Sequence, residues 1–163
     1  MKKMDTKDLV KKIERLTKER MAKEEVISFE DLRKLKGKTS SPTILVIEDD
    51  EIIRRGLKRV LESEGYKVLV AEDGTQLSEV LDDTSIDLIL LDVGLPWIDG
   101  FELAEMMKEH KDLKDIPLVF VSGRTSKEDI QRGFDVGADD YLTKPFDLDK
   151  VKKTVRALIE LNT

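Results

Sequence analysis

The stretch from Ile86 to Gly100, IDLILLDVGLPWIDG, constrains the fold more than any other part of the chain. Its apolar run continues without polar alternation up to Asp92, and turn-forming residues follow at once. A strand that is buried on both faces has this pattern, because helices cover each side of a parallel sheet. Asp92 therefore stands where a buried strand emerges at its carboxyl end, which is the edge at which open parallel sheets place their ligands.

Strand and helix patterns alternate through the chain from residue 43 onward. Short apolar and β-branched runs predict strands at 43–47, 66–71, 86–91, 118–122 and 139–143. Helical periodicity predicts helices at 51–64, 76–81 and 100–110, a fourth capped by Ser126, and a fifth from the cap Asp147 through Leu161. Five βα units with right-handed crossovers form an α/β fold, a doubly wound parallel sheet that is covered on both faces.

The same periodicity predicts which side chains of two helices face the core. For helix 100–110 these are Phe101, Leu103, Ala104, Met106 and Met107, and for the helix after Ser126 they are Ile130, Phe134 and Val136. Trp97 lies in the loop after Asp92, and its large side chain is expected to be exposed and to serve as a contact point.

Charge divides the chain into two parts. Residues 1–42 carry 13 Lys and Arg against 8 Asp and Glu, a net charge of +5, while residues 43–163 carry 16 against 27, a net charge of −11. We therefore expect an N-terminal helical extension at 1–37, a linker at 38–42 and the main domain at 43–163. The acidic main domain would repel nucleic acid phosphates, so we expect no nucleic acid binding by it.

The N-terminal extension has two helical patterns. Leu9, Ile13 and Leu16 form a narrow apolar stripe in the first, which is shorter than a coiled coil requires. Ser28 begins the second in the string SFED, and Gly37 ends it. The stripe is expected to pack on its own domain or on a second copy of the chain.

Composition excludes several classes of protein. The chain has no cysteine, so it has no disulfide, thiolate nucleophile or Cys-type zinc site. Its basic start lacks the apolar run of a signal peptide, and no stretch reaches the roughly 18 apolar residues of a membrane span. A cytoplasmic protein without a membrane partner is therefore expected. The single histidine, His110, lies in a charged stretch and is expected to be solvated.

Chemically useful side chains follow four of the predicted strands. Glu48 and Asp49 follow the first, Asp92 the third, Ser122 ends the fourth and Lys144 follows the fifth. Carboxylates gathered at one sheet edge repel one another unless a cation lies among them, and Mg²⁺ with one or two carboxylates and phosphate oxygens suits such a set. A hydroxyl and an ammonium group nearby would stabilise a phosphoryl group, and a carboxylate can itself accept one.

Four strings carry a resemblance to a known family: ILVIEDDE, LILLDVGLPWIDG, LVFVSGRT and GADDYLTKPF. Over about three quarters of the chain the sequence resembles the response-regulator receiver domains of two-component signalling. The resemblance implies a flavodoxin-like fold with strand order 2-1-3-4-5. It also implies that Asp92 is the phosphoacceptor and that Glu48, Asp49, Asp92 and the backbone carbonyl of Gly94 hold Mg²⁺.

The resemblance assigns further roles at the strand ends. Ser122 is the switch hydroxyl, Lys144 is the ammonium group that contacts the phosphoryl group, and Tyr141 is the aromatic residue that changes rotamer. The Lys144–Pro145 peptide bond is typically cis in such domains.

Three positions depart from the commonest pattern of the family. Glu48 replaces a frequent Asp, Gly94 offers no side chain two residues after the phosphoacceptor, and Gly123 stands where Ala is usual. In domains of this kind, positions such as Gly94 and Arg124 influence how fast the phosphoryl group is lost.

The resemblance predicts a signalling protein rather than a classical enzyme, with at most self-phosphorylation and autodephosphorylation. A histidine kinase or a phosphotransfer protein would donate the phosphoryl group. Since the sequence ends at Thr163, output is expected by protein binding, through the face made by the fourth helix, fifth strand and fifth helix of the domain or through the N-terminal helices. A homodimer through the extension is a further expectation.

Two alternatives remain open from the sequence. The chain is a receiver-fold scaffold that is never phosphorylated, or a phosphohydrolase of the haloacid dehalogenase type that passes through an aspartyl phosphate. The second alternative needs an Asp two residues beyond the nucleophile, and that position is Gly94.

Overall fold

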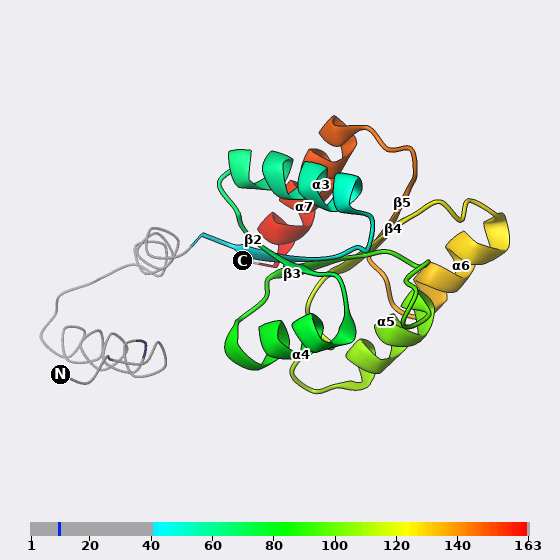
Figure 1. Ribbon diagram of the computed structural model, residues 1–163, viewed down its shortest axis with the longest axis horizontal. Helices are drawn as coiled ribbons and strands as arrows, with labels where there is room; N and C mark the ends of the chain where they lie inside the picture. The colour runs from blue at the N-terminus through cyan, green and yellow to red at the C-terminus, as the bar shows by residue number, and fades with distance from the viewer. Residues whose placement is uncertain (1–9, 11–40, 163) are drawn as a thin grey trace, which may run out of the picture. The chain divides into compact units, whose positions relative to one another are not determined.

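The computed structural model describes residue 10 and residues 41–162 (Figure 1). The chain divides into two units, Met1–Ser40 and Ser41–Thr163, and the second unit contains the whole of the sheet. The apolar stripe and the second helix expected in residues 1–37 lie outside the described residues. The expected boundaries at residues 37 and 42 stay predictions.

A five-stranded parallel sheet forms the centre of the domain. Its strands are β1 (Thr43–Ile47), β2 (Lys67–Ala71), β3 (Leu88–Leu91), β4 (Leu118–Ser122) and β5 (Asp140–Thr143). Their order is β2-β1-β3-β4-β5, and every neighbouring pair is parallel. The doubly wound, flavodoxin-like fold expected from the sequence is therefore confirmed.

Five helices cover the sheet in the described part of the chain. They are α3 (Glu51–Ser63), α4 (Gly74–Asp83), α5 (Gly100–Glu109), α6 (Lys127–Asp135) and α7 (Leu148–Leu161). Helices α3 and α7 lie on one face, while α4, α5 and α6 lie on the other (Figure 1). Among the residues that the structure describes, none of these helices is both long and apolar enough to cross a membrane.

Alternate residues of the strands point to two separate hydrophobic cores. On the α3 and α7 side, Ile44 and Val46 of β1 pack with Leu57, Leu61 and Val155. On the other side, the core is built from β1, β3 and β4 residues with side chains of α4 and α5. Burial on both faces explains the continuous apolar runs of these strands, because each residue meets a helix on one side or the other.

Each helix begins at an expected kind of cap. Asp50, Asp73, Asp99, Ser126 and Asp147 each accept a hydrogen bond from a backbone N–H in the first turn of the helix that follows. The Asp73 cap starts α4 at Gly74, two residues before the predicted start. Gly65, in the turn after α3, has φ +92°, a conformation that glycine adopts without steric penalty.

Two side chains that were predicted to face the core are exposed. Met106 of α5 is 60 % exposed and Phe134 of α6 is 42 % exposed. In α5 the core-facing positions are Phe101, Leu103, Ala104 and Met107, so the buried stripe is narrower than the run of apolar residues. In α6 the buried residue is Gly133, and Phe134, the next residue, lies on the exposed side of the helix.

Candidate metal and phosphoryl site

Strand register brings the candidate site residues to one edge of the sheet. Ile47 pairs with Leu91, so Glu48 and Asp92 leave adjacent strands side by side. The Asp92 N–H donates to the Ile47 carbonyl at 3.0 Å, which continues the ladder. On the other side, Ser122 pairs with Thr143, and the Lys144 N–H donates to the Ser122 carbonyl at 2.8 Å.

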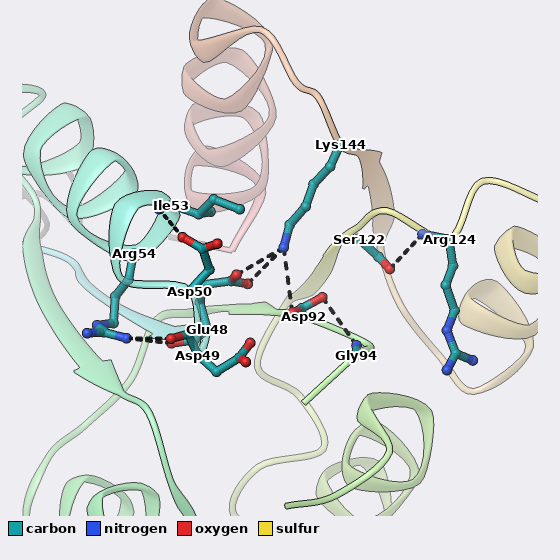
Figure 2. Close-up of polar contacts among 10 residues, drawn as sticks. All are labelled: Glu48, Asp49, Asp50, Ile53, Arg54, Asp92, Gly94, Ser122, Arg124 and Lys144. Carbon is teal, nitrogen blue, oxygen red and sulfur yellow. Dashed lines mark hydrogen bonds and ion pairs between the residues drawn. The ribbon is translucent and has the colours of Figure 1, made fainter. Parts of the chain in front are cut away.

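Three carboxylates converge at this edge. Glu48, Asp49 and Asp92 each place one oxygen within 4.8 Å of the other two (Figure 2). Glu48 is 1 % exposed and Asp92 is 6 % exposed, while Asp49 is open to solvent. The set thus combines two buried carboxylates with one that faces solvent, and the structure brings together the acids that the sequence predicted to meet.

Lys144 lies between two of these acids. Its Nζ is 3.0 and 3.2 Å from the two carboxylate oxygens of Glu48, and 3.6 Å from Oδ2 of Asp92 (Figure 2). The ammonium group is therefore hydrogen-bonded to Glu48 and only ion-paired with Asp92. The peptide bond between Lys144 and Pro145 is cis, as the resemblance implied.

The charge balance of the cluster is unfavourable without a further cation. The pKa of Glu48 is raised from 4.5 to about 7, chiefly because burial disfavours the charged carboxylate. The hydrogen bond from Lys144 opposes this rise, and the negative charge of Asp92 adds to it. One ammonium group cannot neutralise three carboxylates. Closely spaced carboxylate oxygens are ligands that suit a hard divalent cation such as Mg²⁺, so the donor set fits the ion that the sequence predicted.

The Asp92 carboxylate is held by its own loop. Oδ1 accepts a hydrogen bond from the Gly94 N–H at 3.2 Å. Gly94 is exposed, and a Cβ atom added there would meet no other atom within 4 Å. A side chain at this position would therefore meet no steric obstacle at its first atom. The assignment of the Gly94 carbonyl as a metal ligand stays a prediction.

Ser122, Tyr141 and Arg124 form a second hydrogen-bonded group beside Asp92. Ser122 is 1 % exposed, and its Oγ accepts from the Arg124 N–H at 3.1 Å. The Tyr141 hydroxyl donates to the Arg124 carbonyl at 2.6 Å. Figure 2 draws no contact between the Arg124 guanidinium and the Asp92 carboxylate.

Tyr141 already points into the domain. Only 7 % of it is exposed, and its ring centroid lies 5.8 Å from that of Phe120. Burial raises the pKa of the Tyr141 hydroxyl, and the hydrogen bond with Ser122 opposes this rise. The rotamer change that the resemblance implies stays a prediction.

Three residues around the acids were missed or misread in the sequence. Trp97 is half-buried rather than exposed, because its Nε1 donates to the Glu72 carbonyl at 3.1 Å and its ring packs on the core. Arg54 and Glu72 form an ion pair at 3.0 Å, and neither was singled out. The available signal was position alone: Arg54 follows the partly buried Ile53, and Glu72 directly follows the second strand.

The raised pKa of Glu48 predicts an unusual pH dependence of stability in the metal-free protein. A carboxyl whose pKa is higher in the folded state than in the unfolded state binds protons preferentially when folded, so stability falls as pH rises from about 4.5 to about 7. The loss is expected to reach at most about 3–4 kcal/mol, at about 1.4 kcal/mol per pKa unit. Chemical denaturation in chelator across this pH range measures it.

The variant Glu48→Gln is the control for this pH dependence, because it has no titrating group at that position. Its unfolding free energy is expected to change less over the same pH range, and added Mg²⁺ is expected to stabilise the wild-type protein more at pH 8 than at pH 6. Identical pH profiles of the two proteins would contradict the assignment of the raised pKa to Glu48.

Comparison with known proteins places the domain among signalling modules. Residues 44–156 match the family model described as the response regulator receiver domain. The aerobic respiration control protein ArcA of Escherichia coli K12 is 39 % identical over 106 residues, which cover 65 % of this chain and 43 % of ArcA. The response regulator MprA of Mycobacterium ulcerans is 38 % identical over 119 residues, which cover 73 % of this chain and 50 % of MprA. The chain thus spans about half the length of these curated relatives.

Solved structures show the same architecture. The receiver domain of the Francisella response regulator 1452 superposes with a TM-score of 0.70 at 30 % identity, covering 76 % of this chain and all of that one (100 %). The chemotaxis protein CheY4 of Vibrio cholerae superposes with a TM-score of 0.68 at 29 % identity, covering 73 % of this chain and 99 % of that one.

Proposed function

Since the chain belongs to the response regulator receiver domain family, we propose that it accepts a phosphoryl group on Asp92 in a Mg²⁺-dependent reaction and signals by a phosphorylation-dependent change of binding surface. The donor is a histidine kinase or a phosphotransfer protein. The observation that carries the proposal is the convergence of Glu48, Asp49 and Asp92 within 4.8 Å, with the Lys144 ammonium group between Glu48 and Asp92.

The chain's own residues have distinct parts in the transfer. A carboxylate oxygen of Asp92 attacks phosphorus, the P–O bond of an acyl phosphate forms, and the P–N bond to the donor histidine breaks. The histidine nitrogen keeps the electron pair of that bond and takes up a proton. Glu48, Asp49 and Asp92 would hold Mg²⁺, which would supply charge neutralisation at the phosphoryl oxygens.

Lys144 and Ser122 stabilise the acyl phosphate. Lys144 Nζ is already 3.6 Å from Asp92 Oδ2, within reach of an oxygen that the phosphoryl group adds there. Ser122 can donate its hydroxyl hydrogen to the phosphoryl group while its Oγ still accepts the Arg124 N–H, and that accepted bond is released only if Oγ moves toward the phosphoryl group. Release of that bond would also free the segment to which the Tyr141 hydroxyl is bound through the Arg124 carbonyl.

This coupling points to the surface that reads the signal. Tyr141 lies on β5, and its ring packs against Gly133 of α6, where a Cβ atom would approach the ring to 2.8 Å. A displacement of Tyr141 therefore changes how α6 packs on the sheet. Output then passes through the face made by α6, β5 and α7, with the N-terminal residues as a second contact for a target protein.

The test is incubation with acetyl phosphate and Mg²⁺, read by intact mass spectrometry. The expected result is a gain of one phosphoryl group per chain that depends on the divalent cation and is absent in chelator. Absence of an adduct in Mg²⁺, with the protein folded, would contradict the proposal and favour a scaffold that is not phosphorylated. Continuous release of phosphate from phosphate monoesters, rather than from the acyl phosphate alone, would favour a phosphohydrolase instead.

A further inference from the structure

Arg54 contacts the main chain of Glu48 and Asp49 without touching either of their carboxylates. Its side chain is only 14 % exposed. One guanidinium nitrogen, Nη1, donates to the backbone carbonyl of Glu48 at 3.1 Å and to that of Asp49 at 3.2 Å (Figure 2). The other, Nη2, is 3.0 Å from Oε2 of Glu72. One side chain from α3 thus binds two consecutive carbonyls of the loop that carries both acids.

These bonds restrain the part of the backbone that determines where the acidic side chains point. Glu48 and Asp49 follow the last residue of β1. The Glu48 N–H still donates to the Ala71 carbonyl of β2 at 3.3 Å, whereas the Glu48 and Asp49 carbonyls accept from Arg54 instead of from a neighbouring strand. Asp50 is held separately, because its carboxylate caps α3 by accepting the Ile53 N–H. The two hydrogen bonds from Arg54 restrain the carbonyls of Glu48 and Asp49, which lie between the end of β1 and the cap Asp50. These are the residues that carry the two carboxylates.

We propose that Arg54 is a positioning residue for the cation site: by fixing the Glu48 and Asp49 carbonyls it holds the two carboxylates in the arrangement that binds a divalent ion. The inference rests on the proposed function, because it assumes that these acids bind Mg²⁺. It adds a residue that does not contact the ion, and a mechanism that acts through the main chain.

Glu72 anchors the guanidinium from the neighbouring loop. Its Oε1 accepts from Gln76 Nε2 at 3.1 Å, and its backbone N–H donates to Gln76 Oε1 at 2.9 Å. Its carbonyl accepts the Trp97 indole N–H at 3.1 Å. Glu72 is therefore fixed at its side chain and its main chain, and it can hold Arg54 in one place. Through Glu72 and Trp97 the acid loop is also linked to the loop that follows Asp92.

The chemistry of this position favours arginine over lysine. A guanidinium offers several N–H groups in a planar, rigid fork, so it can bond two carbonyls and one carboxylate at the same time. A lysine ammonium is a compact charge on a flexible stem, and it would pair with Glu72 at the expense of one or both carbonyls. The variant Arg54→Lys keeps the positive charge and tests whether the planar guanidinium is required.

The experiment compares Mg²⁺ affinity by isothermal titration calorimetry in the wild-type chain and in the variants Arg54→Ala, Arg54→Lys and Arg55→Ala. Arg55 is the matched control, because it is the next residue of α3, its side chain is 78 % exposed and it pairs with Glu51 at 2.7 Å on the helix surface. Outer-shell partners of metal ligands typically contribute 10- to 100-fold to metal affinity. We expect a loss of about tenfold or more in Arg54→Ala, a smaller loss in Arg54→Lys, and wild-type affinity in Arg55→Ala.

A parallel measurement separates positioning from simple destabilisation. Thermal unfolding in chelator gives the stability of each variant, and the titrations are made far below every midpoint, where all chains are folded. A merely structural Arg54 would lower the midpoint and leave the Mg²⁺ affinity unchanged, and that result would overturn the inference. If Arg54→Ala does not fold, Arg54→Met replaces it, because methionine fills part of the space of the arginine stem and donates no hydrogen bond to either carbonyl; unchanged affinity there would overturn the inference equally.

The outcomes also distinguish this inference from the function on which it rests. No Mg²⁺ uptake by the wild-type chain would contradict the proposed function itself. Mg²⁺ binding by the wild-type chain, with equal affinity in all the variants, would agree with the proposed function and contradict the positioning role of Arg54.

Discussion

Replacing Asp92 by Asn is expected to abolish the phosphoryl adduct that acetyl phosphate and Mg²⁺ produce in the wild-type chain. The amide has no charged oxygen to attack phosphorus, and it withdraws one of three carboxylates from the cation site. The variant should stay folded, because Asn is nearly the same size and the change removes a negative charge that raises the pKa of Glu48. Intact mass spectrometry after incubation with the donor measures the adduct directly.

The control for this substitution is Asp50→Asn, which also changes an acidic residue of the same edge. Asp50 caps α3 by accepting the Ile53 N–H at 3.1 Å, and Asn is an equally good cap. Its carboxylate is not part of the cluster of Glu48, Asp49 and Asp92. The Asp50→Asn chain is therefore expected to gain a phosphoryl group as the wild-type chain does. A full adduct in Asp92→Asn, or its loss in both variants, would contradict Asp92 as the acceptor.

The architecture was predictable because each strand is buried on both faces. In a doubly covered parallel sheet an apolar run such as LILL stands out from its polar surroundings, and an aspartate marks each of its ends. The acids at the strand ends then follow from topology, because parallel strands deliver their carboxyl ends to one edge. Register determines the final placement: the pairing of Ile47 with Leu91 sets Glu48 beside Asp92.

Helix faces were less predictable than strand ends. Met106 and Met107 are equally apolar, yet 60 % of Met106 is exposed and 3 % of Met107. The difference arises from the rotation of α5 about its axis when it packs on the sheet, which composition does not reveal. Trp97 was misread for a related reason, since its indole bonds to Glu72, which precedes it by 25 residues.

The Arg54 network shows where sequence reasoning stops. Arg54 and Arg55 are the same residue type at consecutive positions of one helix. One has a side chain that is 14 % exposed and is bonded to two carbonyls and a carboxylate, while the other is 78 % exposed and lies on the surface. Helical spacing places Arg54, three and seven residues before the buried Leu57 and Leu61, nearer the buried side of α3 than Arg55. It does not reveal the partners of Arg54, because these include main-chain atoms whose orientation exists only in the folded domain.

Two glycine substitutions are expected to have opposite effects on stability. Gly100, the first residue of α5, lies against the main chain of the loop after β3: an added Cβ would overlap the Asp92 carbonyl oxygen and come within 2.5 Å of the Val93 Cα. Both contacts are with backbone, which cannot rotate away as a side chain can. Gly56, inside α3, is exposed, and an added Cβ would meet nothing within 4 Å.

We expect Gly100→Ala to lower the free energy of unfolding by about 1–3 kcal/mol, the usual cost of overpacking, with the upper end favoured because neither backbone contact can be relieved locally. Gly56→Ala should raise it by about 0.5–1 kcal/mol, because alanine loses less backbone entropy than glycine in a helix. Urea denaturation with an unchanged m-value measures both. The Gly100→Ala chain should also form the phosphoryl adduct more slowly, since its added methyl group displaces the peptide that carries Asp92, whereas Gly56→Ala should form it at the wild-type rate. Equal stability of the two variants would mean that the close approach of Gly100 to the Asp92 main chain does not hold in solution.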